Sequence, residues 1–139
     1  MKARAYLFGP EADRSKVRER VLRKSPKAMV QAVRPDAAPN SFVVEMIAAQ
    51  TIEADETGGL LAKRAEIDFL LRLAGTAQIE EALRLVGARR GEGFVLVVAT
   101  PDGTANPKVL GGRPVEPGVG TAEDFARVEK AALLSAGRV

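Results

Sequence analysis

Acidic side chains are the residues of this sequence that could carry out acid–base chemistry, and they occur in short clusters. The clusters are Glu53 with Asp55 and Glu56, Glu66 with Asp68, and Glu80 with Glu81. Glu66 and Asp68 are two positions apart and Glu80 and Glu81 are adjacent, so on a helix the members of each pair point to different sides, while the first cluster lies near a helix end. General acid–base catalysis needs groups that converge on one substrate. We therefore expect solvated acidic surfaces here rather than a catalytic pair.

Metal, nucleophilic and nucleotide-dependent chemistries are excluded because the residues that they require are missing. It contains no cysteine and no histidine, which excludes a Cys/His zinc site, a cysteine nucleophile and a Ser-His-Asp triad. The segment from Gly58 to Lys63 looks like a phosphate loop, but it lacks the second glycine before the lysine and the following Ser or Thr. We predict a protein that is not an enzyme and that binds neither cofactor nor metal.

Positive charge is concentrated near the N-terminus. Residues 1–34 hold ten Lys or Arg against three Asp or Glu, whereas residues 35–68 hold two against seven. Such a basic third is either a surface for a polyanion or simply a solvated helix surface. The chain has one Tyr and five Phe, most of them at core-like positions, so stacking of bases is not predicted. Contacts from Arg and Lys to a nucleic-acid backbone stay open.

The periodicity of apolar residues predicts one small domain over residues 1–139. Strands are expected over 3–8, 28–33 and 94–99, with a further short strand at Val109–Leu110. The run over 94–99 is apolar without alternation, which predicts a strand covered on both faces. Helices are expected from Asp13 or Ser15 to Lys24, from a cap at Asn40 or Ser41 to Ala54, and over 60–74, 76–86 and 121–136. This order predicts an α+β fold, a short β-sheet packed by about five helices. No apolar run of about 18 residues exists, so we expect a cytoplasmic protein without a membrane partner.

Two of these helices have apolar stripes that we predict to face the core. In the helix over 76–86 the stripe is Ile79, Ala82, Leu83 and Val86. In the last helix it is Phe125, Val128, Ala132 and Leu133, while Leu134 lies off the stripe. Gly75 and Gly87 are expected to end helices, and Thr121 with Asp124 resembles a capping box.

One stretch of 25 residues, from Lys63 to Gly87, resembles a known family. Its pattern is a Glu, an apolar helix, a Gly, a Gln-Ile pair, an Ala-hydrophobic step and a closing Gly, carried here by Glu66, Gly75, Gln78, Ile79, Ala82, Leu83 and Gly87. An apolar strand follows, as the family requires. The sequence resembles the small kinase-binding subunit of the KEOPS tRNA-threonylcarbamoyladenosine complex, related to the eukaryotic PRPK-binding proteins.

The resemblance implies a non-catalytic KEOPS subunit with two partners. It would bind the small lobe of the kinase/ATPase subunit, and it would recruit tRNA through the 3′ CCA end for threonylcarbamoyladenosine modification. The residues it assigns to RNA are Gly75, Gln78, Lys63, Arg64, Arg72, Arg84, Arg89 and Arg90. The residues considered for the kinase are Leu134, Phe125 and Val128, all in the last helix.

Each assignment has a simpler alternative. Gly75 could serve only as a corner between helices, Gln78 as a helix cap, and the basic residues as solvated side chains. As a whole, the protein could instead be a regulator that activates the kinase without touching RNA. An enzyme acting on a small anion is a third alternative. Grouping of the basic residues into one patch would favour RNA, and a pocket with converging carboxylates would favour the enzyme.

Overall fold

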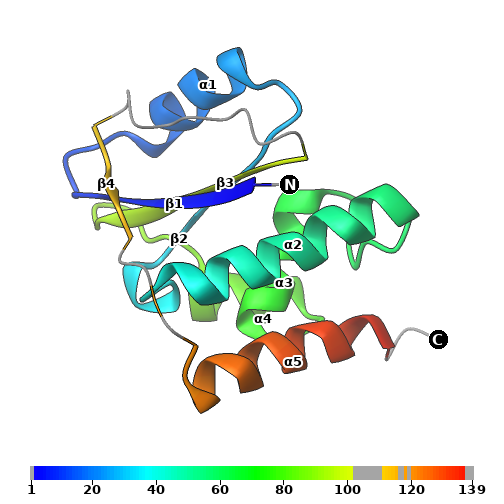
Figure 1. Cartoon of the computed structure of the whole chain (residues 1–139). Helices are drawn as coiled ribbons and strands as arrows, with labels where there is room; N and C mark the ends of the chain where they lie inside the picture. The colour runs from blue at the N-terminus through cyan, green and yellow to red at the C-terminus, as the bar shows by residue number, and fades with distance from the viewer. Residues whose placement is uncertain (1, 102–110, 116–117, 119, 137–139) are drawn as a thin grey trace.

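Four strands form one antiparallel sheet with helices on both of its faces (Figure 1). The computed structural model describes residues 2–101, 111–115, 118 and 120–136. The elements are β1 (Lys2–Phe8), α1 (Arg14–Lys24), β2 (Met29–Val33), the short 3₁₀ helix η1 (Pro35–Ala37), α2 (Ser41–Thr57), α3 (Ala65–Ala74), α4 (Ile79–Val86), β3 (Phe94–Thr100), β4 (Arg113–Pro114) and α5 (Ala122–Ala136). The strand order is β2-β3-β1-β4, and the expected α+β fold is confirmed.

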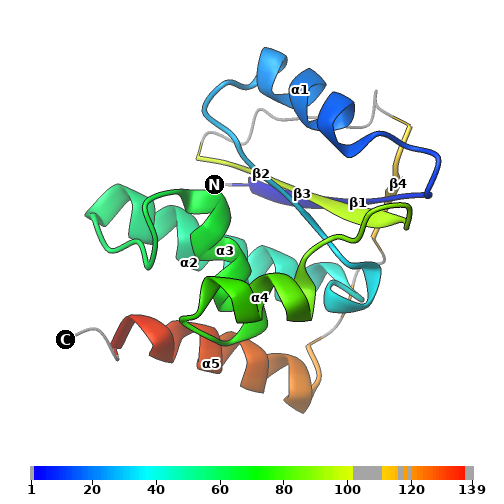
Figure 2. The ribbon, with the colours of Figure 1, turned by 180° about the vertical axis from the view of Figure 1, so that it is seen from behind.

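The central strand β3 is buried along its whole length, as its unbroken apolar run predicts. Its side chains alternate between two cores. Phe94, Leu96 and Val98 pack with α1, and Phe94 stacks on Phe8 with ring centroids 5.1 Å apart. The other side of the strand contributes to the larger core with α2 and α3. Figure 2 shows the resulting layers, with α1 alone on one face of the sheet and α2–α5 on the other.

Polar side chains at the predicted caps define where three helices begin. The Asp13 carboxylate accepts hydrogen bonds from the backbone N–H groups of Ser15 and Lys16, at 3.0 and 3.2 Å. Asn40 caps α2 in the same way. Thr121 and Asp124 form the predicted capping box, each accepting from the other's backbone N–H at 3.1 Å. The hydrogen bond from the Thr121 N–H to the Asp124 carboxylate is the largest cause that lowers the pKa of Asp124 below its ordinary value, and it outweighs the opposing effect of burial.

Several predicted boundaries were wrong by a turn. Helix α2 continues to Thr57, α3 begins at Ala65 rather than at residue 60, and α4 begins at Ile79 rather than at residue 76. The segment before α3 is not helical, because the Leu61 N–H donates to the Asp68 carboxylate at 2.9 Å and draws this segment over the first turns of α3. The strand expected at Val109–Leu110 lies outside the described residues.

Candidate functional site

The corner between α3 and α4 carries the glycine and glutamine of the family pattern. Helix α3 ends at Gly75, which has a left-handed backbone with φ of 73°. The N–H groups of Gly75 and Thr76 both donate to the Leu71 carbonyl, at 2.8 and 3.1 Å. This conformation is disfavoured for residues with a Cβ atom, so Gly75 has a structural role at the corner.

Gly75→Ala is expected to lower the free energy of unfolding by about 1–2 kcal/mol, because alanine resists the left-handed conformation. The added Cβ atom would also lie 3.0 Å from two carbons of the Lys130 side chain, which is flexible enough to move. The matched control is Gly58→Ala, which has φ of 76° and open space around the Cβ position. Urea unfolding should give similar losses for both variants. A much larger loss for Gly75→Ala would mean that the Lys130 contact is rigid.

Gln78 occupies the N-cap position of α4 and is exposed. Its side chain makes no capping hydrogen bond, while its backbone N–H donates to the Thr76 hydroxyl at 3.2 Å. The side chain of Gln78 therefore does not cap α4, contrary to the simpler alternative. A shallow hollow, lined by residues 76–81, lies at this position. The amide of Gln78 can offer two donors and one acceptor to a ligand there.

The predicted core stripe of α4 was half wrong. Ala82 and Val86 are buried against α3, but Ile79 is 47% exposed and Leu83 is 49% exposed. Helix α4 packs mainly on α3, which leaves Ile79 and Leu83 about half exposed. Periodicity identifies an apolar stripe, but it does not say how many neighbours the fold supplies.

Arg72 was wrongly expected at the RNA surface. It is only 2% exposed and forms an ion pair with Asp68, with Nε 2.7 Å from Oδ1. The guanidinium also donates to the Ala131 carbonyl of α5 at 3.4 Å. Asp68, expected on a solvated acidic surface, is buried as well and accepts from the Thr51 hydroxyl at 2.7 Å. This pair ties α2, α3 and α5 together and is not accessible to RNA.

The remaining basic residues lie on three separate segments and do not all gather at the Gly75 corner. Arg84 is exposed on α4 and pairs with Glu81 at 2.7 Å. Lys63 and Arg64 lie exposed at the start of α3, where Arg64 contacts Glu66 at 3.5 Å. Arg89 and Arg90 are exposed in the turn before β3. The ten residues of α3 separate Arg64 from the Gly75 corner by about 15 Å.

Helix α5 presents apolar side chains to solvent that the sequence assigns to the core. Phe125 is 57% exposed and Leu133 is 59% exposed, whereas Ala131 is fully buried. Val128 and Leu134 are half-buried. Phe125 packs edge-on against Phe42 of α2, with ring centroids 5.1 Å apart. The buried face of the helix is therefore rotated away from the predicted stripe, and the exposure of Leu133 is a feature that periodicity did not predict.

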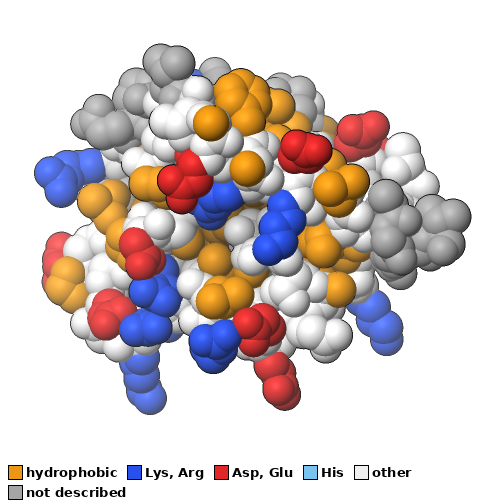
Figure 3. All heavy atoms as spheres, turned by 90° about the horizontal axis from the view of Figure 1, so that it is seen from below, with side chains coloured by type: hydrophobic (Ala, Val, Ile, Leu, Met, Phe, Trp, Pro, Cys, Tyr) orange, Lys and Arg blue, Asp and Glu red, His pale blue; other side chains and the backbone are white. Residues whose placement is uncertain are grey.

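This face is mixed in character. Viewed from the α5 side, apolar side chains lie at the surface with Lys and Arg side chains between them (Figure 3). Met46 of α2 is also among the exposed large apolar residues. Isolated apolar side chains are ordinary on protein surfaces, but aromatic and leucine side chains from neighbouring helices favour a contact with another protein.

Comparison with known proteins identifies a relative over part of the chain. Over 51 residues, the sequence is 39% identical to the KEOPS complex subunit Cgi121 of Pyrococcus abyssi (strain GE5 / Orsay). This segment is similar to a KEOPS subunit. It makes up 37% of this chain and spans 30% of the length of the relative. No family model matches the sequence.

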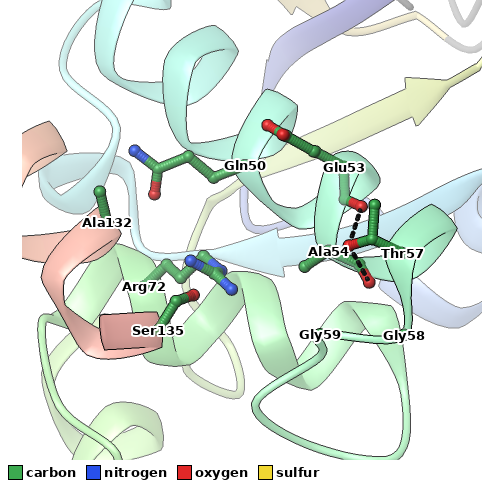
Figure 4. A pocket seen from close by; sticks show the side chains of 9 residues that line it. All are labelled: Gln50, Glu53, Ala54, Thr57, Gly58, Gly59, Arg72, Ala132 and Ser135. Atoms are coloured by element: carbon green, nitrogen blue, oxygen red, sulfur yellow. Dashed lines mark hydrogen bonds between the residues drawn. The ribbon is translucent and has the colours of Figure 1, made fainter. Parts of the chain in front are cut away.

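A pocket of about 530 Å³ lies between α2, α3 and α5 (Figure 4). Gln50, Arg72 and Ser135 line it from three different helices, and Glu53 is the one carboxylate among its described lining residues. These residues therefore do not supply the converging carboxylates that the enzyme alternative requires. Within the described ranges, no group of three or more acidic residues could hold a metal ion. No described helix is long and apolar enough to cross a membrane.

Proposed function

We propose that this chain is a non-catalytic subunit of a KEOPS-type complex and acts in tRNA modification. The observation that carries the proposal is its partial similarity to a KEOPS subunit. The α3–α4 corner supports it, because Gly75 and Gln78 lie there as the family pattern expects. The proposed partners are the kinase/ATPase subunit and tRNA.

The corner is the proposed contact for the 3′ CCA end of tRNA. The exposed Gln78 amide can meet base edges or ribose hydroxyls, because its oxygen accepts no capping hydrogen bond from the backbone of α4. Arg84 lies on the adjoining helix, while Lys63, Arg64, Arg89 and Arg90 supply charge farther away. Arg72 is removed from the proposed RNA contacts, because it is buried in its pair with Asp68.

Helix α5 is the proposed contact for the small lobe of the kinase. Phe125 and Leu133 are exposed there, and Val128 and Leu134 lie partly covered beside them. Interfaces between proteins usually centre on aromatic and aliphatic side chains that become fully buried on binding. This surface lies on the side of the sheet away from α1, so it leaves the basic residues of α1 uncovered.

A regulator that activates the kinase without binding RNA is the second candidate. Two observations at the corner favour it. Glu80 and Glu81 lie beside Gln78, and Glu81 neutralises Arg84. The exposed Ile79 and Leu83 also make this side of α4 apolar. A surface of this kind suits a protein partner better than a phosphate backbone.

Binding of intact tRNA and of the same tRNA lacking its 3′ CCA separates the two candidates. We expect the intact RNA to bind about tenfold more tightly, which corresponds to about 1.4 kcal/mol. Gln78→Ala should reduce this preference about three- to tenfold, the value of one hydrogen bond. Thr57→Ala, which alters an exposed neutral side chain at the end of α2, is the control. Equal binding of both RNAs would contradict CCA recognition and favour the regulator.

A further inference from the structure

Four arginines from three separate segments lie in a row between α1 and the helices below the sheet. Arg14 and Arg18 of α1 line a hollow of about 610 Å³ together with Arg90 from the turn before β3. The edge strand β2 contributes Gln31 and Ala32 to the same hollow. Arg64 extends the row, because it contacts Glu66 at 3.5 Å and Arg18 reaches the same carboxylate at 3.9 Å.

The fold holds these segments together through long-range contacts. Arg14 donates to the Ala88 carbonyl at 3.3 Å, which joins the start of α1 to the chain just after α4. Gln31 donates to the Glu66 carbonyl at 3.0 Å, which joins β2 to the start of α3. Gly87 pairs with Val33 at the end of β2. The arginines are therefore positioned by the edge of the sheet, although they are far apart in the sequence.

The charge of the hollow is suited to an anion. Its lining carries three guanidinium groups against the carboxylates of Asp13 and Glu92. The Asp13 carboxylate is occupied in capping α1. In the described part of the chain, Arg14 and Arg90 pair with no carboxylate within 4.0 Å. Guanidinium groups bind phosphate oxygens in a planar, two-pronged geometry, so unpaired arginines in one hollow favour a phosphate ligand.

We propose that this arginine row, Arg64, Arg18, Arg14 and Arg90, binds the phosphodiester backbone of RNA. The proposal rests on the proposed function and adds a second RNA surface to it. An extended backbone fits better than a single free phosphate, because the row is longer than the hollow. Arg64 lies outside the lining of the hollow and is next to Arg18 through the Glu66 carboxylate that both contact. Arg64, at one end of the row, lies at the end of α3 opposite the Gly75 corner, so an RNA that contacts both Arg64 and the corner must span about 15 Å.

The test uses a charge-removing variant and a matched control. The variant is Arg14→Gln, Arg18→Gln and Arg90→Gln together. The control is Lys16→Gln, Arg20→Gln and Arg23→Gln, which removes the same charge from exposed positions on α1 but outside the lining of the hollow. Binding of intact tRNA and of tRNA lacking the 3′ CCA is measured at about 50–200 mM salt. Thermal unfolding verifies that both proteins are folded.

We expect the variant to bind both RNAs about tenfold more weakly at low salt, and its salt slope to be smaller by about 2–3. Any preference for the intact 3′ end should be unchanged, so failure of the CCA contact is distinguishable from failure of this surface. Equal binding by variant and control would overturn the proposal. Inorganic phosphate is titrated as a separate ligand. Saturable phosphate binding that the variant loses, without any change in RNA affinity, would also overturn it in favour of a small-anion site.

Discussion

Asp68→Asn is expected to lower the free energy of unfolding by about 3–5 kcal/mol. The substitution keeps the shape of the side chain but leaves the buried Arg72 guanidinium without a counter-charge. Arg72 is only 2% exposed, and its guanidinium is held in place by the Ala131 carbonyl of α5. Chemical unfolding measures the loss directly. The magnitude is large because a buried charge without a partner bears its full desolvation cost.

Two comparisons make this expectation specific. Glu81→Gln breaks an exposed pair of the same 2.7 Å length on α4 and should cost less than about 1 kcal/mol. The triple variant Asp68→Leu, Arg72→Met and Thr51→Val removes the charges together with the buried hydroxyl that bonds Asp68. It should recover part of the stability that Asp68→Asn loses, because the charges are gone but the Leu61 N–H loses its acceptor. If Asp68→Asn and Glu81→Gln cost the same, the pair is not buried in solution.

Phe125→Asp is expected to weaken binding to the kinase/ATPase subunit at least about 30-fold, which corresponds to about 2 kcal/mol at an interface centre. The prediction rests on the proposed function. Phe125 is mostly exposed, and its ring is held by Phe42, so the free protein already presents it in a defined orientation. Leu134 is a poorer probe, because it is half-buried one turn after the fully buried Ala131.

The control for this experiment is Leu85→Asp, which places the same charge at an exposed leucine of α4. Calorimetric titration of the kinase subunit with both variants gives the affinities, and circular dichroism verifies the fold. Loss of binding by Phe125→Asp alone places the interface on α5. Unchanged affinity for Phe125→Asp would exclude this face, and loss by Leu85→Asp alone would move the interface to α4.

Local signals in the sequence determined most of the secondary structure. The caps at Asp13, Asn40 and Thr121 and the left-handed turn at Gly75 act within a few residues, so sequence alone indicated them. The apolar run of β3 likewise predicted a strand covered on both faces. These features depend on neighbours in the chain, and tertiary contacts did not override them.

Tertiary structure alone decided which charged and apolar residues are accessible. Asp68 and Arg72 are four residues apart, a spacing equally compatible with a solvated pair, and only the packing of α2 and α5 on α3 buries them. The exposure of Ile79 and Phe125 depends in the same way on which helix faces receive a neighbour. The arginine row joins residues up to 76 positions apart, from Arg14 to Arg90. Periodicity and charge describe a helix face, but only contacts between distant segments determine what that face meets.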